Sequence, residues 1–350
     1  MGTINPMKEK ELWIFNLATD LDNPVLAATH AWILECSYHV KKVYVVSTHV
    51  GRYDLPKDVE VFELNGGSFK LRISAGLKLF RIVLRIIKSN SIVFHHMSQK
   101  TAALIGLPLR IARIKQGLWY SHSSKSFSLF WAQLCVDKIF TSVPGAYPFN
   151  SKKIIYVGHG IEVNRFIKNA DKNRSNPYSI LSVGRITQIK NLQDILDAIS
   201  KIPNEIKNQV KIDFVGPIDD KSYANNLEKI AARNSINLRI IPGIPHTEIS
   251  EIYRGYSIYF TGTPHSIDKA TIEAAVSGCL IVTSNLICLE FLEITNPNFD
   301  HCKLEEQLLD IFNQNSDQLS VNRAMISHVA ANKNNVSNTC LRILRKINEK

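Results

Sequence analysis

Residues 179–200 read SILSVGRITQIKNLQDILDAIS and contain the strand–turn–helix unit that decides the fold. A short apolar run ends at Val183, Gly184 allows a turn, and Leu192–Ser200 spaces its apolar residues as a helix does. Similar apolar runs alternate with helical patterns along the rest of the chain. This alternation predicts an α/β protein with parallel sheets, in which helices form the crossovers between strands.

A polar stretch, Lys168–Pro177, divides the pattern and is typical of an interdomain linker. Seven strands are expected before it and five after it. The 350 residues fit two domains of ordinary size. We therefore expect two Rossmann-like domains in series, with ligands at the carboxyl ends of their strands. The amphipathic run Asn338–Ile347 predicts a last helix.

The composition excludes several classes of protein. Hydrophobic residues make up 45% and charged residues 21%, as in globular proteins, so disorder is excluded as the main state. No apolar run reaches the ~18 residues of a membrane span, and no secretory signal is visible at the N-terminus. The six cysteines form no CxxC pair. This usage favours reduced thiols in the cytosol and argues against a zinc site.

The positive charge is concentrated in the first half of the chain. The whole sequence has 42 Lys and Arg against 31 Asp and Glu, a net charge of +11. Residues 1–165 carry 21 and 11 of these, a net of +10, whereas residues 166–350 carry 21 and 20, a net of +1. Between Glu63 and Asp137 there are eleven basic residues and no acidic one. Such an excess suggests an anionic partner.

Part of this basic stretch is a predicted amphipathic helix at Leu71–Ser89, whose apolar side is broad. Two interpretations are open: a core helix with a solvated basic edge, or a surface that meets anionic lipid head groups. The lack of acidic residues over 73 positions favours the lipid surface. At ~100° per residue, five cations fall within an arc of ~80°: Lys70, Lys78, Arg81, Arg85 and Lys88.

Two segments of the second half carry groups suited to a nucleoside diphosphate. Arg185 and Lys190 follow the strand that ends at Val183, and cations beside helix N-termini suit a diphosphate. Asp268 is placed to cap a helix at the same strand edge, and Glu273 lies about one turn inside that helix. A carboxylate there could accept both hydroxyls of a ribose, and the apolar neighbours predict that it is buried and needs a partner.

Other ligand motifs are absent or weak. Neither GxGxxG nor a Walker sequence occurs, which argues against a dinucleotide or P-loop site. Asp20 and Asp22 have the DxD spacing that some sugar transferases use for a metal. Because they precede a helix expected to begin near Pro24, capping of that helix is the favoured interpretation.

Taken together, five segments resemble the retaining glycosyltransferases of family 4, which have the GT-B fold. The resemblance covers nearly the whole chain, and the segments follow the family's order. They are LWYSH (118–122), VGHGIEVNRF (157–166), SVGRITQIKN (182–191), IIPGIPHTEISEIYRGYSIYF (240–260) and TPHSIDKATIEAAVSGCLIVTSN (263–285). The resemblance implies two Rossmann-like domains that face a central cleft.

The resemblance also implies roles for individual residues. Arg185 and Lys190, after Gly184, would bind the donor diphosphate, Glu273 would hold the ribose, and His122 would lie beside the transferred sugar. His95 and His96 end the neighbouring strand and are weaker candidates. The remaining donor contacts would be backbone amides at the sugar and phosphates, and two residues that flank the base. These are Ser266, Ile267, Asp268 and Lys269, and Gly243 and Ile244.

The sequence departs from the family's pattern at three places. His265 stands where the family has the first Glu of its Glu-x7-Glu element, a position that contacts the donor sugar's hydroxyls. A histidine offers a donor or an acceptor, whereas a carboxylate only accepts, so the identity of the sugar is open. Asn16–Asn23 replaces the family's Gly-Gly loop, and Glu162 replaces an Asp near the hinge.

The resemblance implies an acceptor-binding domain at 1–167, a donor-binding domain at 168–335, and a C-terminal helix at 336–350 that packs back toward the first domain. The expected enzyme is a metal-independent, retaining, hexosyltransferase-type glycosyltransferase without a cofactor. Its expected partners are a nucleoside diphosphate sugar, a glycan or lipid-linked acceptor of cell-envelope polysaccharide synthesis, and the anionic inner face of the membrane. Its expected location is the cytoplasm, peripheral to that membrane.

Three alternatives stay open at this point. A catalytically silent homologue, acting as a sugar-nucleotide sensor or a partner subunit, is favoured by His265. Sugar-nucleotide epimerases share the GT-B fold, although the order of motifs fits transferases better. Nucleic-acid binding would fit the charge. However, no RNP, KH, zinc-finger or helix-turn-helix pattern accompanies the basic stretch, and an apolar helix side suits phosphate tracking poorly.

Overall fold

The structure is a computed structural model that divides into two compact units. The first unit comprises Met1–Ile161 and Asn335–Lys350, and the second comprises Glu162–Asn334. The residues that the structure describes are 6–23, 26–64, 69–167, 174, 176–245, 248–294 and 303–349.

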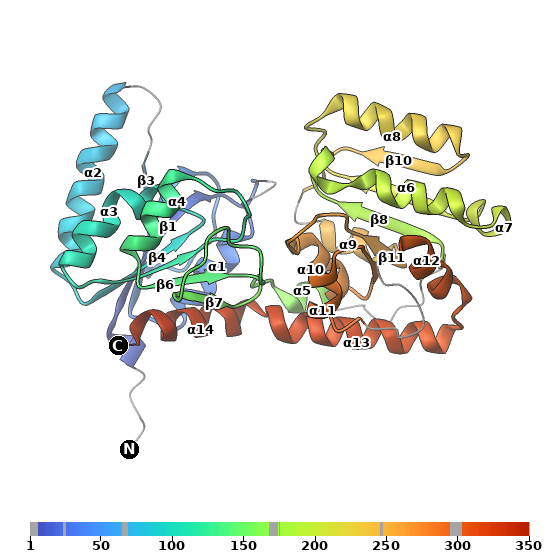
Figure 1. Cartoon of the computed structure of the whole chain (residues 1–350). Helices are drawn as coiled ribbons and strands as arrows, with labels where there is room; N and C mark the ends of the chain where they lie inside the picture. The colour runs from blue at the N-terminus through green and yellow to red at the C-terminus, as the bar shows by residue number, and fades with distance from the viewer. Residues whose placement is uncertain are drawn as a thin grey trace, which may run out of the picture. The chain divides into compact units, whose positions relative to one another are not determined.

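The first unit is built on a seven-stranded parallel sheet in the order β3-β2-β1-β4-β5-β6-β7, which can be followed in Figure 1. The order reverses between β1 and β4, as in a doubly wound sheet. The strands are β1 Glu11–Thr19, β2 Lys42–Val50, β3 Val59–Glu63, β4 Ser91–His96, β5 Lys115–Trp119, β6 Lys138–Thr141 and β7 Ile154–Tyr156.

Helices cover both faces of this sheet, because successive residues of a buried strand point to opposite faces. In β1, Leu12 and Ile14 join the core under α1 (Thr29–Ser37) and α14 (Val336–Asn348). Trp13 and Phe15 join the core under α2 (Phe69–Ile87). The latter face also carries α3 (Gln99–Ile111) and α4 (Phe127–Cys135), and a short 3-10 turn, η1 (Pro6–Glu9), precedes β1.

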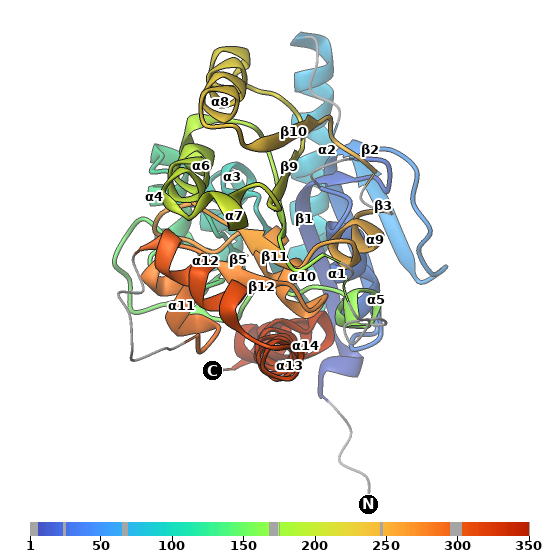
Figure 2. The ribbon, with the colours of Figure 1, turned by 90° about the vertical axis from the view of Figure 1, so that its right-hand side faces the viewer.

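The second unit is built on a five-stranded parallel sheet in the order β10-β9-β8-β11-β12 (Figure 2). Its strands are β8 Ser179–Val183, β9 Lys211–Val215, β10 Asn237–Ile241, β11 Ile258–Phe260 and β12 Leu280–Val282. One face packs on α6 (Leu192–Lys201), α8 (Lys221–Arg233) and α12 (Leu304–Asn313). The central α10 contacts both β11 and β12. The other elements are η2 Gln188–Lys190, α5 Val163–Ile167, α7 Asn204–Lys207, α9 Ile249–Arg254, α10 Lys269–Val276, α11 Leu286–Phe291 and α13 Ser316–Asn334.

The boundary between the units lies after Ile161, six residues before the boundary at 167 that the sequence suggests. The reason is α5, because Phe166 packs its ring against Tyr253 of the second unit, 6.1 Å between centroids. At the other end, α14 and its N-cap residue Asn335 belong to the first unit. Most of the expected linker, residues 168–173 and 175, lies outside the described residues.

The expected capping role of Asp20 and Asp22 is wrong. The helix α1 begins at Thr29 rather than near Pro24, which itself lies outside the described residues, and its N-cap is Ala28. Asp22 instead pairs with Arg52, 2.6 Å from Oδ1 to Nη2, and this pairing lowers the pKa of the Asp22 carboxyl. Asp20 accepts the backbone N–H of Asp22. The two carboxylates therefore fix the turn that follows β1.

Within the described ranges, no helix combines the length and apolar character that crossing a membrane requires. Five cysteines are free and buried, namely Cys36, Cys135, Cys279, Cys288 and Cys340, and Cys302 lies outside the described residues.

Candidate active site

The second sheet has its switch point between β8 and β11. The chain runs from β8 to β9 and β10 on one side, and then returns to β11 on the other side of β8. The loops that leave β8 and β11 therefore open at the same strand edge, where doubly wound sheets bind ligands. A hydrogen bond joins the two loops, because Asn191 Nδ2 donates to Gly262 O at 3.0 Å.

Glycines shape the loop after β8. Gly184 has a φ of 144°, a conformation that other residues rarely adopt, and a Cβ there would lie 3.2 Å from Cε and Nζ of Lys190. Gly216, after β9, approaches it so closely that an added Cβ would lie 1.9 Å from Gly184 O. The sequence identified Gly184 but missed Gly216. Together they bring two backbones and the Lys190 side chain into one small volume.

Lys190 is held by an ion pair across the switch point. Its Nζ lies 2.5 Å from Oδ2 of Asp268, and Thr263 Oγ1 donates to the same oxygen at 2.7 Å. Asp268 occupies the N-cap position of α10, as expected, but its carboxylate accepts no helix N–H, so the predicted side-chain cap is wrong. The carboxylate positions the lysine instead. It leaves the first amides of an eight-residue helix available to an anion.

Glu273 is 3% exposed, and its partners include Lys269 and Tyr253. Lys269 Nζ lies 3.0 Å from Oε1, and the Tyr253 hydroxyl donates to Oε2 at 3.2 Å. Burial, reinforced by the Glu273 charge, raises the pKa of Tyr253, so the phenol stays protonated and donates. The expected burial of Glu273 and its need for a partner are confirmed. Tyr253 lies on a different helix, and no sequence pattern connected it with Glu273.

Arg185 has a separate partner from Lys190. Its Nη1 lies 3.2 Å from Oδ2 of Asp219 in the loop after β9, and both side chains are largely exposed. An exposed ion pair of this kind contributes little stability, about 0–1 kcal/mol. Arg185 can therefore exchange Asp219 for a ligand anion at small cost, whereas Lys190 is already fixed in position.

The loop after β11 is fixed by a side chain that the sequence analysis did not identify. Asn285 Nδ2 donates to Thr263 O at 2.9 Å and to Ser266 O at 2.8 Å. This fixes the backbone from 263 to 266, the start of the segment whose amides were expected at the donor. His265 lies exposed within it, with a φ of 60°.

The residues expected at the base lie after β10, at the outer strand of the sheet. Gly243 packs beside the loop after β9, where an added Cβ would lie 3.3 Å from Pro217 Cδ. Ile244 follows it and is half-buried, and Ile267, in the loop after β11, is buried.

His122 belongs to the first unit and lines a pocket of about 470 Å³ there. Its Nδ1 accepts the backbone N–H of Ser124 at 3.0 Å, which fixes the ring and leaves Nε2 to donate. The pocket lies at the carboxyl ends of the central strands, beside the switch point between β1 and β4. Its other lining residues are Leu17, Thr48, Met97, Ser98, Gln99, Lys100, Thr101, Tyr120 and Ser124.

His95 and His96, the weaker candidates, do not line this pocket. His95 is fully buried, stacks on Phe15 at 5.2 Å, and has a pKa lowered to about 4 by burial. His96 stacks on Trp119 with 5.0 Å between ring centroids. His95 therefore belongs to the core of the first unit, and His96 is a partly buried residue beside that core. Across the described part of the chain, no three His, Cys, Asp or Glu side chains are grouped so as to hold a metal ion.

Comparison with known proteins finds a family similarity in the second unit. Residues 163–299 match the family model described as "Glycosyl transferases group 1". The chain is also 27% identical over 135 residues to a capsular polysaccharide biosynthesis glycosyltransferase, CapH, from Staphylococcus aureus. That match covers 38% of this chain and 36% of the relative, so the chain matches about a third of the relative's length.

The fold is similar to that of solved structures over nearly the whole chain. HepE from Anabaena, in complex with UDP and glucose, superposes with a TM-score of 0.71 at 14% identity, covering 98% of this chain and 100% of that one. A glycosyltransferase from Rickettsia africae superposes with a TM-score of 0.69 at 16% identity, covering 97% and 98%. These superpositions confirm the expected GT-B fold class. The match of residues 163–299 to the family model bears out the resemblance to glycosyl transferases group 1.

Proposed function

We propose that this protein is a retaining glycosyltransferase of the hexosyltransferase type, which moves a sugar from a nucleoside diphosphate sugar to a hydroxyl acceptor. The observation that carries the proposal is the cluster of Lys190, Asp268, Lys269 and Glu273 at the switch point of the second sheet. This cluster lies within the segment that matches the group 1 family model.

The donor binds across the loops after β8 and β11. Its diphosphate contacts Arg185, Lys190 and the amides at the start of α10, because these groups supply positive charge at one strand edge. The two Glu273 oxygens accept the ribose hydroxyls, with Tyr253 and Lys269 holding the carboxylate in place. Gly243 and Ile244 flank the base. UDP in the HepE complex supports a nucleotide as the donor's leaving group.

Catalysis follows from charge that develops on the leaving diphosphate. When the bond between sugar and phosphate breaks, Arg185, Lys190 and the α10 N-terminus stabilise that charge, and no metal ion or cofactor is needed. Asp268 and Thr263 fix Lys190 before the donor arrives, so little reorganisation remains at the moment of reaction. The acceptor hydroxyl attacks the face that the diphosphate leaves, and the anomeric configuration is retained.

The acceptor is a glycan or lipid-linked sugar of cell-envelope polysaccharide synthesis. It binds in the 470 Å³ pocket of the first unit, where His122 Nε2 donates to it or to the transferred sugar. CapH acts in capsular polysaccharide biosynthesis, which supports a polysaccharide acceptor. The enzyme works in the cytoplasm, and the basic α2 helix rests on the anionic inner face of the membrane.

The experiment is a donor panel. Purified protein is screened with UDP-, GDP- and other nucleotide sugars by thermal shift, and release of the nucleoside diphosphate is then measured with a lipid-linked acceptor. We expect one nucleotide to stabilise the protein and its sugar to be turned over. No stabilisation by any nucleotide would overturn the donor site and the enzyme together.

His265 favours a second candidate function, a catalytically silent homologue that senses a sugar nucleotide or supports an active partner. It occupies the exposed turn where the family has a glutamate, and an imidazole cannot accept two sugar hydroxyls as a carboxylate does. Stabilisation by a nucleotide sugar without any release of nucleotide, in the same panel, would identify this function. A His265→Glu variant that gains turnover would support it further.

A further inference from the structure

The helices on one face of the first sheet carry large apolar side chains that point away from the core. The exposed fractions of these side chains run from 38% to 82%. We call them the outer apolar face. They are Ile73, Leu77, Phe80, Leu84 and Ile87 on α2, Leu104, Leu107 and Ile111 on α3, and Phe127, Phe130, Trp131 and Leu134 on α4.

Each set is an ordered stripe along one side of its helix, because its members are three or four residues apart, apart from the adjacent Phe130 and Trp131 on α4. The helix α2 is divided into three sectors. One sector is buried, through Leu79, Ile82, Val83 and Ile86, and a second is the exposed apolar stripe. The third is basic. This explains why the apolar side looked unusually broad in the sequence, since only part of it faces the core.

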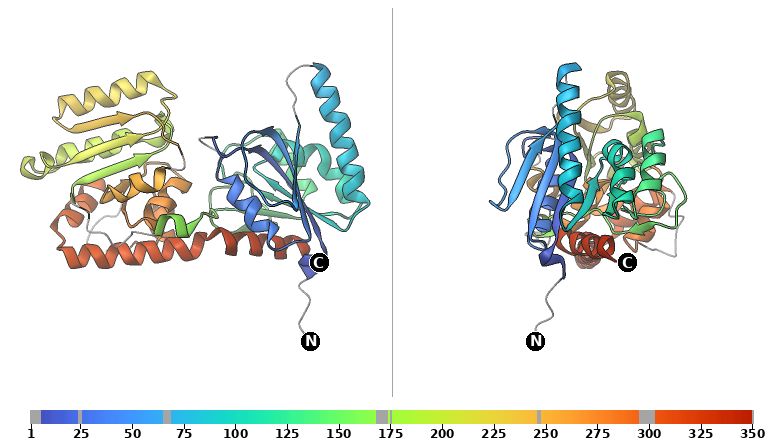
Figure 3. Two further views of the ribbon diagram at one scale, coloured as in Figure 1. Left: turned by 180° about the vertical axis from the view of Figure 1, so that it is seen from behind. Right: turned by 90° about the vertical axis from the view of Figure 1, so that its left-hand side faces the viewer.

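The three stripes lie on neighbouring helices. The right-hand view of Figure 3 looks onto α2 in light blue, with the blue strands β2 and β3 on one side and the teal and green α3 and α4 on the other. The same order follows from the contacts of α2 with α3 and of α3 with α4. Arg110 ties α3 to α4, with Nη1 donating to Leu134 O at 2.7 Å. The outer apolar face therefore spans three neighbouring helices.

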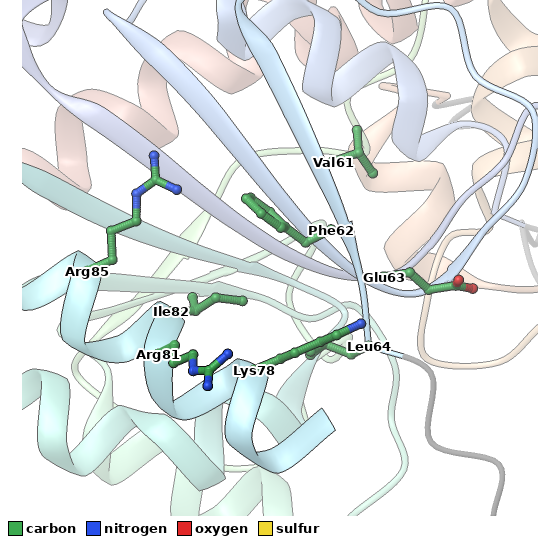
Figure 4. Close-up of a pocket in the computed structure, with 8 residues that line it drawn as sticks. All are labelled: Val61, Phe62, Glu63, Leu64, Lys78, Arg81, Ile82 and Arg85. Carbon is green, nitrogen blue, oxygen red and sulfur yellow. The ribbon is translucent and has the colours of Figure 1, made fainter. Parts of the chain in front are cut away.

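A basic pocket flanks this face on its β3 side. It has a volume of about 430 Å³ and lies between α2 and the end of β3 (Figure 4). Lys78, Arg81 and Arg85 project into it from α2, over an apolar floor that includes Phe62 and Ile82. Its remaining lining residues are Val61, Glu63 and Leu64.

Two of these cations have no carboxylate partner in the part of the chain that the structure describes, namely Lys78 and Arg81. Arg85 donates to the Tyr44 hydroxyl at 2.9 Å and covers its ring, which keeps that guanidinium in place. The one carboxylate of the pocket, Glu63, accepts the backbone N–H of Val50 at 3.2 Å and points away from the cations in Figure 4. The pocket thus combines free positive charge with apolar surface. Of the other two cations expected on this surface, Lys88 is exposed, and the side chain of Lys70 lies outside the described residues.

Charge decides which partner fits. Residues 64–136 contribute all three stripes and contain eleven Lys and Arg but no Asp or Glu. A symmetric dimer would bring two identical surfaces together and oppose these cations with one another. An anionic bilayer satisfies both features, because apolar side chains enter the acyl boundary while flanking Lys and Arg meet head-group phosphates. Exposed apolar patches of this extent are uncommon on proteins that stay in solution.

We infer that the outer apolar face inserts into the surface of an anionic phospholipid bilayer and that the pocket of Lys78, Arg81 and Arg85 holds a lipid head-group phosphate. The inference deepens the membrane part of the proposed function, naming the surface that inserts and the group that it recognises. It does not depend on which sugar is transferred.

Trp131 provides a direct test. Of the four tryptophans, Trp13, Trp32 and Trp119 are buried, whereas Trp131 on α4 is 40% exposed. The full chain is mixed with phosphatidylglycerol vesicles whose acyl chains are brominated near the head group. We expect a blue shift and quenching of fluorescence that a Trp131→Phe variant loses, while that variant still sediments with vesicles. Sedimentation of the native chain without quenching would overturn insertion by this face.

Two further variants separate insertion from charge recognition. Leu107→Ser with Phe130→Ser should weaken binding to these vesicles at least ~10-fold, whereas Val321→Ser, at a still more exposed apolar residue of the second unit, should not. Lys78→Glu with Arg81→Glu should remove the preference for phosphatidylglycerol over phosphatidylcholine. Equal binding to both lipids by the native chain would overturn the head-group site. If sedimentation shows concentration-dependent dimers and no vesicle binding, the partner of the outer apolar face is a second copy of this chain, and the inference of a bilayer is overturned.

Thermal shift with the nucleotide-sugar panel, in the absence of vesicles, keeps this test apart from the proposed function. None of the substituted residues lies in the second-unit cluster, so each variant should keep the native response to nucleotides. Lipid binding without any nucleotide response would leave this inference standing and overturn only the transferase. A nucleotide response without lipid binding would overturn this inference and leave the proposed donor site standing.

Discussion

The two switch points of this protein lie at the same place in similar sheets but are chemically unlike. At the second, Lys190 is already paired with Asp268 across two loops, and Lys269 is paired with Glu273 along α10. At the first, a 470 Å³ pocket is lined by neutral and apolar groups, with Lys100 and His122 as its basic members. The second is preorganised for one charged ligand, whereas the first offers space and hydrogen bonds.

The same contrast extends to the surfaces of the units. The second half of the chain is nearly neutral, and Arg185, Lys190 and Lys269 lie in its candidate donor site. The first half carries ten of the eleven excess positive charges, and its basic α2 flank adjoins an apolar face. Charge that develops on a leaving group is best stabilised by cations already held in position. Binding to a membrane instead requires a broad surface with apolar and basic side chains.

The largest effect is expected at the two cations proposed to contact the donor diphosphate. Lys190→Ala, and separately Arg185→Ala, should lower turnover by ~10² to 10³-fold, since each removes charge from the leaving diphosphate. The measurement is release of nucleoside diphosphate under saturating donor. Lys201→Ala, which breaks only an exposed pair with Glu305, is the matched control. Near-native turnover in both variants would remove the donor role from this cluster.

The next effect concerns the first unit and its stability. His95 has a pKa lowered from 6.5 to about 4 by burial, so the unfolded chain binds its proton more readily between these values. The resulting stability is complete above pH 6.5 and is lost as the pH falls toward 4. His95→Leu should abolish this loss, about 3 kcal/mol of unfolding free energy between pH 7 and pH 4. Urea unfolding at both pH values measures it.

An unchanged pH dependence in the His95→Leu variant would mean that His95 is charged in the folded protein. It would then no longer belong to the core and would return as a candidate for the site of the first unit.

Glu273→Gln should weaken donor binding by about 10-fold with a smaller change in turnover, because an amide accepts one ribose hydroxyl where the carboxylate accepts two. The fold should persist, since the Tyr253 hydroxyl still finds an acceptor. Isothermal titration with the donor found in the panel measures the change, and Glu290→Gln, exposed on α11, is the control. Equal affinity of the native and Glu273→Gln proteins for the donor would mean that Glu273 does not bind the ribose.

The smallest effect tests whether Lys190 must be held in place. Thr263→Val removes the hydroxyl that donates to Asp268 Oδ2 at 2.7 Å. One hydrogen bond contributes about 0.5–1.5 kcal/mol, so turnover should fall by roughly 3-fold. Thr263→Ser keeps the hydroxyl and should restore the native rate. If Val and Ser variants behave alike, the bond has no part in positioning Lys190.

The sequence by itself determined most of the fold. Apolar runs bounded by Gly and polar turns predicted seven strands and then five, as the structure has them, and the run that ends at Val183 is β8. The predictions were weakest for short elements: α5, α7 and α11 were missed, because one or two turns of helix leave little periodicity. Arg185, Lys190 and Glu273 could be proposed as donor contacts because they lie in contiguous segments beside recognisable strands.

Only the tertiary structure decided which distant residues act together. Tyr253 meets Glu273, Asn285 holds the loop at Ser266, and Gly216 closes on Gly184, each across a separation that carries no local pattern. The carboxylate of Asp268, which the sequence predicts as a helix cap, instead forms an ion pair with Lys190. The structure also divided the apolar side of α2 into a buried and an exposed stripe. Periodicity reports which side of a helix is apolar, whereas packing decides how much of that side finds a partner.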